Sequence, residues 1–289
     1  MAKRCFLMVN PTSGTFSQSK IDRIMVSLSQ SGMEPVLLKT GSPLDPMLFA
    51  SRICAGEPDP LIVVAGGDGT VNGVLNGLEP GVATLAVIPL GTSNVLAREL
   101  KICSVDDALG RLAGGKTRTA SVGELFCAGQ KKRFLLMAGI GVDGAVVRGV
   151  RLSEKRRIGK GAYLLSAMRL LFAWDRNRLQ VAGAGKTLSC HSVIVCNAAK
   201  YGGDFSLAPE ADLFSPGFQV LCINGGRLTY LKLALLLALG RAACSRSVAR
   251  FGASELLVSG TKAVQLDGDY FGDGPLRLRS IPDFVRLIV

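Results

Sequence analysis

Short apolar segments alternate with helix-like segments through the first 115 residues of the chain. The helix-like segments, such as Ser17–Ser31 and Pro43–Ala55, place apolar residues at helical spacing. This order predicts parallel strands joined by helices that cover both faces of the sheet. Ligands of such sheets bind beyond the carboxyl ends of the strands. The strand-length apolar segments are 4–10, 35–39, 61–65 and 84–89.

The pattern changes after Thr117, where short β-rich segments follow one another with turn residues between them. Such spacing predicts an antiparallel sandwich or a barrel-like domain. Two helical excursions interrupt it, near 153–174 and 228–246. We therefore expect a Rossmann-like α/β domain with a parallel sheet over 1–117 and a β-rich antiparallel sandwich domain over 118–289.

The charge balance favours a polyanionic partner. The chain has 34 Lys and Arg against 22 Asp and Glu, a net charge of +12, which suits nucleic acid, an anionic membrane surface or a nucleotide. Aromatic residues make up only 6% of the chain, so platforms for base stacking are scarce and we expect no nucleic-acid partner.

The eight cysteines form no CxxC pair, a pattern typical of a reduced intracellular protein without a zinc site or disulfides. No signal peptide and no apolar run of about 20 residues is evident, so we expect a cytoplasmic location. The single histidine, His191, alternates with apolar neighbours and is interpreted as structural. Any general base is then a carboxylate.

Three glycine motifs call for comparison. Gly110–Thr117 fits the phosphate-loop pattern GxxxxGK[ST], but a helix precedes it and an extended segment follows, so we interpret it as a helix end. Gly139–Gly144 fits GxGxxG without the βαβ unit that such a site needs, and predicts a tight turn. Gly66–Thr70, "GGDGT", follows a strand and opens a helix, where backbone N–H groups face phosphate. Its Asp68 either caps the turn or acts through a cation or a lysine.

Four stretches together resemble the soluble bacterial lipid kinases of the diacylglycerol kinase family, which share GGDGT with the sphingosine, ceramide and NAD kinases. "NPTSG" resembles the NPxSG loop of the lipid-kinase branch, and "PLGTSNVLAREL" its PLGTxNxxAR segment. "VQLDGD" resembles its DGE motif near the C-terminus. The Asn-Glu pair of NAD kinase is absent after the glycine loop. The four stretches are Asn10–Gly14, Gly66–Thr70, Pro89–Leu100 and Val264–Asp269.

The resemblance implies an N-terminal nucleotide domain, a C-terminal β-rich domain and a site in the cleft between them. It implies ATP and Mg2+ as cofactors, with Asp68 orienting the metal and the phosphates. Asp267 or Asp269 would be the general base for the lipid hydroxyl, although Asp-Gly is also a common hairpin turn. The catalytic residues implied are Asp68, Asp267 and Asp269. The nucleotide contacts implied are Asn10, Pro11, Thr12, Ser13, Gly14, Thr40, Gly66, Gly67, Asp68, Gly69, Thr70, Val71, Asn72 and Thr92.

Two positions depart from the family pattern. Asp269 stands where the family usually has Glu, which leaves open which carboxylate reaches the hydroxyl. Pro216-Gly217 replaces an Asp-Gly pair that helps bind a structural magnesium in the family. Proline offers no side-chain oxygen, so we expect no structural metal beside Asp212.

Basic residues cluster around the two helical excursions. The apolar stretches 162–174 and 231–239 lie among them, which predicts reversible docking on an anionic membrane surface. The basic cluster that precedes the first stretch is Arg148, Arg151, Lys155, Arg156, Arg157 and Lys160, and the second stretch is flanked by Lys232, Arg241, Arg246 and Arg250. For either segment alone, the alternative is a solvated basic face over ordinary core helices.

The sequence thus predicts an ATP-dependent lipid kinase at the inner membrane surface, with diacylglycerol as acceptor and phosphatidic acid as product. A sphingoid base, ceramide or phosphatidylglycerol remains open as the acceptor. The alternative from another class is a nucleotide- or lipid-binding regulator without catalysis. The edges of the sandwich are compatible with a homodimer.

Overall fold

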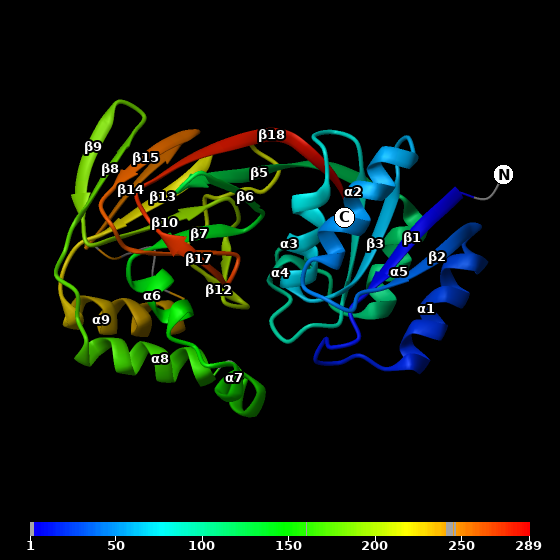
Figure 1. The fold of residues 1–289 in the computed structure, drawn as a ribbon, viewed down its shortest axis with the longest axis horizontal. Coiled ribbons are helices and arrows are strands. Elements are labelled where there is room, and N and C mark those ends of the chain that lie inside the picture. The colour runs from blue at the N-terminus through cyan, green and yellow to red at the C-terminus, as the bar shows by residue number, and fades with distance from the viewer. Residues whose placement is uncertain (1–2, 160, 241–244, 246) are drawn as a thin grey trace. The chain divides into compact units, whose positions relative to one another are not determined.

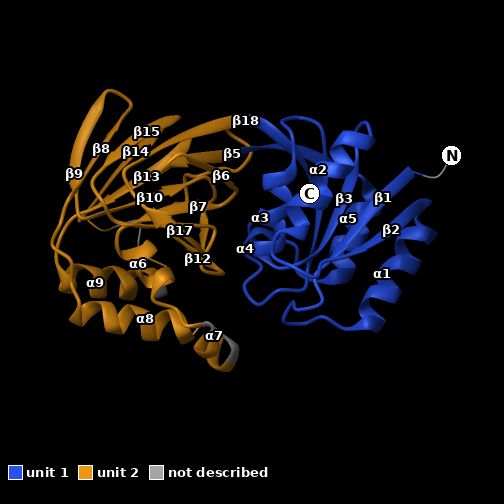
Figure 2. Cartoon of the chain, viewed as in Figure 1, with its two compact units in different colours: residues 1–121, 282–289 blue, residues 122–281 orange. Residues whose placement is uncertain are grey.

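The computed structural model describes residues 3–159, 161–240, 245 and 247–289. The chain divides into two compact units (Figure 2). Unit 1 contains the residues up to Ser121 together with Pro282–Val289, and unit 2 contains Val122–Ile281. This division differs from the expected domains of 1–117 and 118–289, because the last eight residues belong with unit 1.

Unit 1 is built on a parallel sheet, as the sequence predicts. The four strands lie in the order β2-β1-β3-β4, and β3 is buried along its whole length because helices cover both faces. Helices α1 and α5 contact one another, and α2 packs on α3. The strands are β1 (Lys3–Val9), β2 (Met33–Lys39), β3 (Leu61–Gly66) and β4 (Thr84–Pro89), and the helices are α1 (Gln18–Gln30), α2 (Asp45–Gly56), α3 (Asp68–Gly77), α4 (Val95–Glu99) and α5 (Val105–Gly114) (Figure 1).

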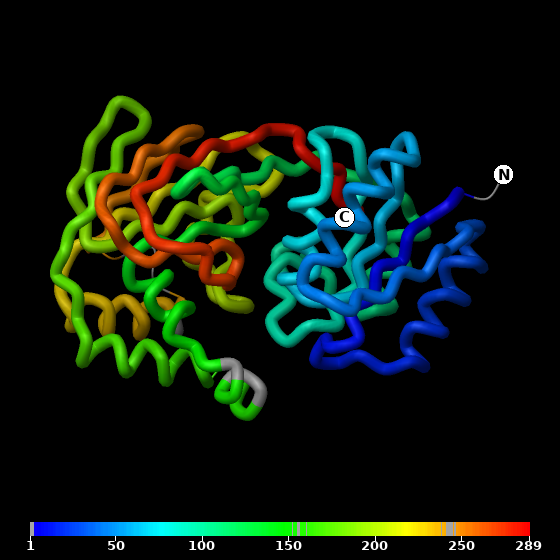
Figure 3. The backbone as a smooth tube through the Cα atoms, in the orientation of Figure 1, coloured from blue at the N-terminus to red at the C-terminus, as the bar shows by residue number. Residues whose placement is uncertain are grey.

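The C-terminal part of strand β18 (Leu276–Ile288) completes the unit 1 sheet. It pairs in parallel with β4 through Arg286↔Thr84 and Leu287↔Leu85. The red C-terminal end of the tube in Figure 3 reaches this sheet. Phe284 and Leu287 have no exposed surface, so this end of the strand is part of the unit 1 core.

Unit 2 is a sandwich of two antiparallel sheets, which confirms the predicted fold class. One sheet has the order β14-β13-β10-β7-β16-β17, and the facing strands are β5, β6, β8, β9, β15 and the first part of β18. Side chains from both sheets, such as Phe134 of β6 and Phe218 of β13, stack in one buried core. The strands are β5 (Thr117–Cys127), β6 (Gln130–Phe134), β7 (Met137–Ile140), β8 (Leu179–Gly183), β9 (Lys186–Cys190), β10 (Ser192–Cys196), β11 (Lys200–Tyr201), β12 (Phe205–Ser206), β13 (Phe218–Ile223), β14 (Val248–Ala253), β15 (Glu255–Ser259), β16 (Ala263–Leu266) and β17 (Asp269–Asp273).

Both faces of the central strands of unit 2 are buried. Along β10, Val193 and Val195 face the sandwich core, while Ile194 and Cys196 face a second apolar cluster on the outer side of the sheet. Tyr230 and Leu233 pack on that second cluster. They belong to α9, which therefore covers the outer face of the sheet. The helices of unit 2 are α6 (Val142–Arg148), α7 (Leu152–Ile158), α8 (Gly161–Phe172) and α9 (Arg227–Ala238).

The two helical excursions expected from the sequence are α7 with α8, and α9. The predicted end of the second excursion, with Arg241 and Arg246, lies outside the described residues, as does Lys160. In the parts of the chain that the structure describes, no helix has both the length and the apolar character needed to traverse a bilayer.

Candidate active site

The loops after β1 and β3 meet at the switch point of the unit 1 sheet. These strands are neighbours, and the chain leads from β1 to β2 on one side and from β3 to β4 on the other. Open α/β sheets bind ligands at the carboxyl ends of the strands at such a switch point. The Asn10 Nδ2 group donates a hydrogen bond to Thr70 Oγ1 at 3.2 Å. Asn10 Oδ1 accepts from the N–H of Thr12 at 2.9 Å. Asn10 therefore fixes its own loop against the GGDGT stretch.

The loops after β3 and β4 touch through two glycines. A Cβ at Gly91 would lie 2.5 Å from the Cα of Gly67, closer than real Cβ contacts allow. Leu90 N–H also donates to the carbonyl of Gly66 at 3.0 Å. The glycines of GGDGT thus do more than form a turn, because one of them lets two backbone loops lie in direct contact.

The carboxylate of Asp68 bonds to the backbone of α4 and not to the start of its own helix, α3. Asp68 is the first residue of α3, whose N-cap is Gly67. Its Oδ1 accepts a hydrogen bond at 3.1 Å from the N–H of Leu96, at the start of α4. The capping role that the sequence left open is therefore present, but the helix that Asp68 caps is α4.

The remaining predicted nucleotide residues differ in what they can offer. The start of α3 carries the positive end of the helix dipole, and the free N–H groups of such a helix start are typical of anion sites. Val71 and Asn72 are buried, with 3% and 4% of their surfaces exposed. Thr92 is exposed, and its hydroxyl lies where a Cβ on Gly14 would approach within 3.0 Å.

Thr40 follows β2 at the same edge of the sheet. Its N–H donates to the carbonyl of Val9 at 2.9 Å, and its hydroxyl lies 3.4 Å from the same oxygen. Its surface is 8% exposed. The structure thus brings the predicted nucleotide residues to one end of the unit 1 sheet, in the four loops that follow β1 to β4.

The DGD stretch lies in unit 2 as a tight hairpin. Asp267 and Gly268 form the two-residue loop between β16 and β17, with φ values of 49° and 91°. Two successive positive φ angles are typical of a type I′ turn, which Asp-Gly favours. The hairpin interpretation is therefore confirmed.

The carboxylate of Asp267 is held by backbone donors. Its Oδ2 accepts from the N–H of Leu135 at 2.7 Å, and its Oδ1 accepts from Leu136 and Met137, both at 2.9 Å. Asp267 N–H donates to the Met137 carbonyl at 3.0 Å. These bonds tie the hairpin to the connection between β6 and β7 and leave the carboxylate in one orientation.

Asp269 is placed differently. It begins β17 on the far side of the turn, opposite Leu266, and its surface is exposed. Of the two candidate bases, Asp267 organises the turn, and Asp269 presents its carboxylate to the solvent.

A series of hydrogen-bonded side chains supports the same turn from the interior of unit 2. Gly268 N–H donates to Gln265 Oε1, and Gln265 Nε2 donates to Asp143 Oδ2, each at 2.7 Å. Tyr201 donates its hydroxyl to Asp143 Oδ1 at 2.5 Å. Burial raises the pKa of Asp143 above the ordinary carboxyl range, and the bonds from Tyr201 and Gln265 partly offset that effect.

Sequence reasoning did not identify Asp143, Gln265 or Tyr201. The signal was an acid inside the GxGxxG match, which was interpreted only as a tight turn. A Cβ on Gly139 would lie 1.9 Å from Asp143 Oδ2. The absence of a side chain at Gly139 therefore leaves room for the buried carboxylate of Asp143.

Asp212 satisfies both carboxylate oxygens within its own turn. Oδ1 accepts from the N–H of Phe214 at 3.1 Å, and Oδ2 accepts from the Ser215 hydroxyl at 2.9 Å. Gly217 N–H donates to Ser280 Oγ at 3.0 Å. The Asp212 carboxylate is thus engaged in a local hydrogen-bonded turn just before Pro216-Gly217.

The other expectations about single motifs can be compared with the structure. The phosphate-loop match lies at the end of α5, where Gly115 is the C-cap with φ 64°, so its interpretation as a helix end is confirmed.

A hollow of about 410 Å³ is lined by residues such as Phe126, Leu257 and Pro275. It contains none of the predicted site residues.

Comparison with known proteins agrees with this architecture. The sequence matches the diacylglycerol kinase catalytic domain over residues 4–125 and the YegS C-terminal NAD kinase beta sandwich-like domain over residues 137–289. A diacylglycerol kinase of Bacillus subtilis (strain 168) is 28% identical over 280 residues, which cover 93% of this chain and 91% of that protein. One of Staphylococcus epidermidis is 26% identical over 303 residues, with 99% and 92% covered.

A solved structure shows the same fold. The crystal structure of a diacylglycerol kinase from Bacillus anthracis superposes with a TM-score of 0.74 at 19% identity, covering 99% of this chain and 96% of that one. The family whose catalytic domain this chain matches is a family of ATP-using kinases. The chain belongs to the diacylglycerol kinase catalytic-domain family, which is a family of lipid kinases, and carries the YegS-type C-terminal domain.

Proposed function

We propose that this kinase transfers the γ-phosphoryl group of ATP to the hydroxyl of diacylglycerol and produces phosphatidic acid. The observation that carries the proposal is the Asn10–Thr70 bond, which holds the loops after β1 and β3 together at the sheet's switch point, where ligands of such sheets bind. The relatives named above, both called diacylglycerol kinase, support that acceptor. A sphingoid base, ceramide or phosphatidylglycerol remains the alternative acceptor.

In this proposal, unit 1 binds the nucleotide. The loop at Asn10–Gly14 and the start of α3 would contact the phosphates through backbone N–H groups. Thr40 and Thr92 would complete the pocket. Because phosphoryl transfer depends mainly on positioning and on neutralising charge, fixed loops of this kind supply much of what the reaction needs.

The residues present fit a magnesium ion held mostly by the phosphates. Within the described residues, no group of three or more His, Cys, Asp or Glu side chains could form a closed metal site. Magnesium commonly uses one or two carboxylates, substrate phosphates and water, and Asp68 would be the carboxylate in unit 1. Bound there, the ion would neutralise negative charge on the phosphates.

Unit 2 supplies the base. We assign Asp269 to the removal of the proton from the acceptor hydroxyl as the new O–P bond forms and the bond to ADP breaks. Asp267 is assigned to holding the turn, because three backbone N–H groups already bond its carboxylate. We further propose a cytoplasmic enzyme that acts at the membrane surface, and a homodimer remains compatible with the fold.

Phosphate transfer from radiolabelled ATP to lipids in mixed micelles tests the proposal. The panel contains diacylglycerol, monoacylglycerol, phosphatidylglycerol, sphingosine and ceramide, with and without magnesium. We expect label on diacylglycerol, and loss of the label in Asp269→Asn. Label on another lipid would replace the acceptor, and ATP binding without label on any lipid would favour a regulator.

A further inference from the structure

Two helices of unit 2 expose apolar stripes. On α8, Leu164, Met168 and Phe172 are 67%, 53% and 86% exposed, and their four-residue spacing places them on one face. On α9, the exposed residues Leu228, Leu231, Leu235 and the C-cap Leu239 follow one another at three- and four-residue spacing. We call these seven side chains the apolar helical face.

The opposite sides of both helices are anchored to the sandwich. On α8, Ala162 and Ser166 are buried, and the Ser166 hydroxyl donates to the Val146 carbonyl of α6 at 2.7 Å. On α9, Tyr230 and Leu233 pack on the outer face of the β10 sheet. The apolar helical face is therefore the side of each helix that turns away from the unit 2 core.

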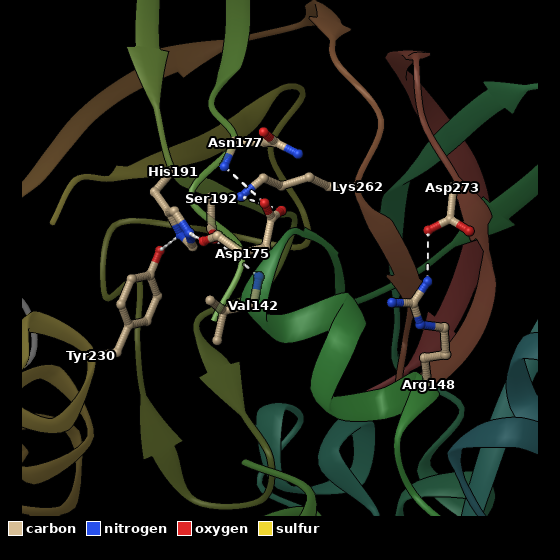
Figure 4. Close-up of polar contacts among 9 residues, drawn as sticks. All are labelled: Val142, Arg148, Asp175, Asn177, His191, Ser192, Tyr230, Lys262 and Asp273. Atoms are coloured by element: carbon tan, nitrogen blue, oxygen red, sulfur yellow. Dashed lines mark hydrogen bonds and ion pairs between the residues drawn. The ribbon is translucent and has the colours of Figure 1, made fainter. Parts of the chain in front are cut away.

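One cluster of side chains around His191 holds both the end of α8 and the start of α9 in place. Trp174, just after α8, stacks on His191, and Tyr230 of α9 bonds to His191 Nδ1 at 3.0 Å. His191 Nε2 donates to the carbonyl of Asp175 at 2.6 Å, and the buried Lys262 pairs with the Asp175 carboxylate at 3.2 Å (Figure 4). Both helices are thus held by fixed contacts on the inner side, although large apolar side chains remain exposed on the outer side.

The charges around the face suit anionic headgroups. Neither α8 nor α9 contains an acidic residue. Within 151–183 the acids are Glu154, which pairs with Arg169 at 2.6 Å, and Asp175, which pairs with Lys262. Exposed Arg227 and Lys232 lie on α9 itself. Apolar faces bordered by basic residues and free of uncompensated acid bind the interface of anionic bilayers.

We propose that the apolar helical face is the element that docks this kinase on a lipid bilayer, by inserting its side chains into the interfacial layer. The occupant rests on the proposed function, because a lipid acceptor resides in such a bilayer. The inference differs from docking by the basic cluster alone, since it assigns most of the binding to apolar contacts. Arg148 of that cluster is already paired with Asp273 at 3.1 Å.

The test compares Phe172→Gln/Leu228→Gln with Val26→Gln/Leu44→Gln. Val26 and Leu44 are 55% and 62% exposed in unit 1 and serve as matched controls. Glutamine retains good helix propensity, and all four side chains are exposed, so folding is preserved. Binding is measured by sedimentation with phosphatidylcholine vesicles, with and without phosphatidylglycerol, at low and high salt.

We expect the Phe172→Gln/Leu228→Gln variant to bind vesicles about 100-fold more weakly, since each large apolar side chain removed lowers binding about tenfold. Salt should weaken wild type and variant in parallel and leave this ratio intact. The control variant should bind as wild type does. Equal vesicle binding by all three proteins would overturn the proposal. A change of the Phe172→Gln/Leu228→Gln variant from dimer to monomer without weaker vesicle binding would also overturn it, because a second copy of the chain would then cover the face.

A kinase assay on the same proteins separates the two proposals. With a short-chain diacylglycerol dispersed in detergent, the variant should retain wild-type activity, but it should lose activity on vesicles. If no lipid is phosphorylated and vesicle binding still depends on Phe172 and Leu228, the docking face stands and the proposed function fails. If activity on vesicles is unchanged in the variant, the docking face fails and the kinase assignment stands.

Discussion

The indole ring of Trp174 lies parallel to the imidazole of His191, with centroids 4.8 Å apart and an interplanar angle of 5°. The chain has one Trp and one His, so the fluorescence of a single tryptophan reports on a single imidazole. Burial lowers the pKa of His191, the positive charges of Lys262 and Arg178 act in the same direction, and Asp175 opposes them.

The unfolded chain therefore takes up a proton that the folded ring resists. We expect the free energy of unfolding to decrease as the pH falls from about 6.5 toward the lowered pKa of His191. Trp174 fluorescence of the folded protein should change only around the lowered pKa of His191, because the folded ring becomes protonated there. Urea unfolding across this range measures the first effect. His191→Gln should remove the slope assigned to this group, and an unchanged slope in that variant would refute the assignment.

The two carboxylates of the DGD turn should separate stability from catalysis. Asp267→Asn replaces an acceptor of three N–H bonds by an amide, and we expect a loss of about 1.5–3 kcal/mol in the free energy of unfolding. Asp269→Asn should leave thermal unfolding unchanged and lower kcat by roughly 10²–10⁴-fold. Calorimetry and the micelle assay on both variants check this. The reverse result, a stable and inactive Asp267→Asn beside an active Asp269→Asn, would exchange the two roles.

The contact between Gly67 and Gly91 predicts a position where one methyl group matters. Gly91→Ala places a Cβ 2.5 Å from backbone, so the loops after β3 and β4 must separate. We expect ATP affinity to fall at least tenfold in titration calorimetry, since we propose that these loops contact the phosphates. Gly110→Ala in α5 is the matched control, because its Cβ meets nothing within 4 Å and alanine favours helix by about 0.5–1 kcal/mol. Equal ATP binding by both variants would remove the loop contact from the nucleotide site.

Asp143 should produce a pH dependence opposite to that of His191. Its raised pKa means that the folded protein retains a proton that the unfolded chain releases. The free energy of unfolding should therefore decrease as the pH rises from about 4 toward the raised pKa. Asp143→Asn can still accept from Gln265 and donate to Tyr201, but it cannot titrate. A wild-type slope that persists in this variant would show that another group is responsible.

The turn at Asp212 predicts indifference to chelators. Both of its carboxylate oxygens already bond to Phe214 N–H and Ser215 Oγ. We expect chelator to leave the melting temperature unchanged and elemental analysis to find no metal that remains after gel filtration. A tightly bound divalent ion that is lost in Asp212→Ala would contradict this.

Local patterns were sufficient to predict much of unit 1. The apolar segment 84–89 is flanked by turn residues in the sequence, and strand β4 has the same bounds, Thr84–Pro89. Side chains on both faces of this strand are buried. The positions of the loops that we propose to bind the nucleotide could also be predicted, because each loop follows a strand directly in the sequence. The β-rich texture after Thr117 likewise predicted the sandwich.

Contacts between distant residues could not be read in the same way. Asp143 bonds to Tyr201 and Gln265, which are 58 and 122 positions away. Asp267 finds its donors more than a hundred positions earlier. Helix α6 was missed because its glycine-rich start favours a turn. The apolar segment at the end of β18 predicts a strand, but nothing in it indicates which sheet it joins.

The C-terminal end of β18 also sets an order of events during synthesis. Strand β4 leaves the ribosome before any residue of unit 2, yet its neighbour at Arg286 and Leu287 is made only after the whole of unit 2. Until then β4 is the open edge of a parallel sheet, and such edges recruit strands from other molecules. A chain interrupted within unit 2 therefore exposes the edge of the unit 1 sheet, which can pair with another nascent copy, and completion of the last strand closes that route.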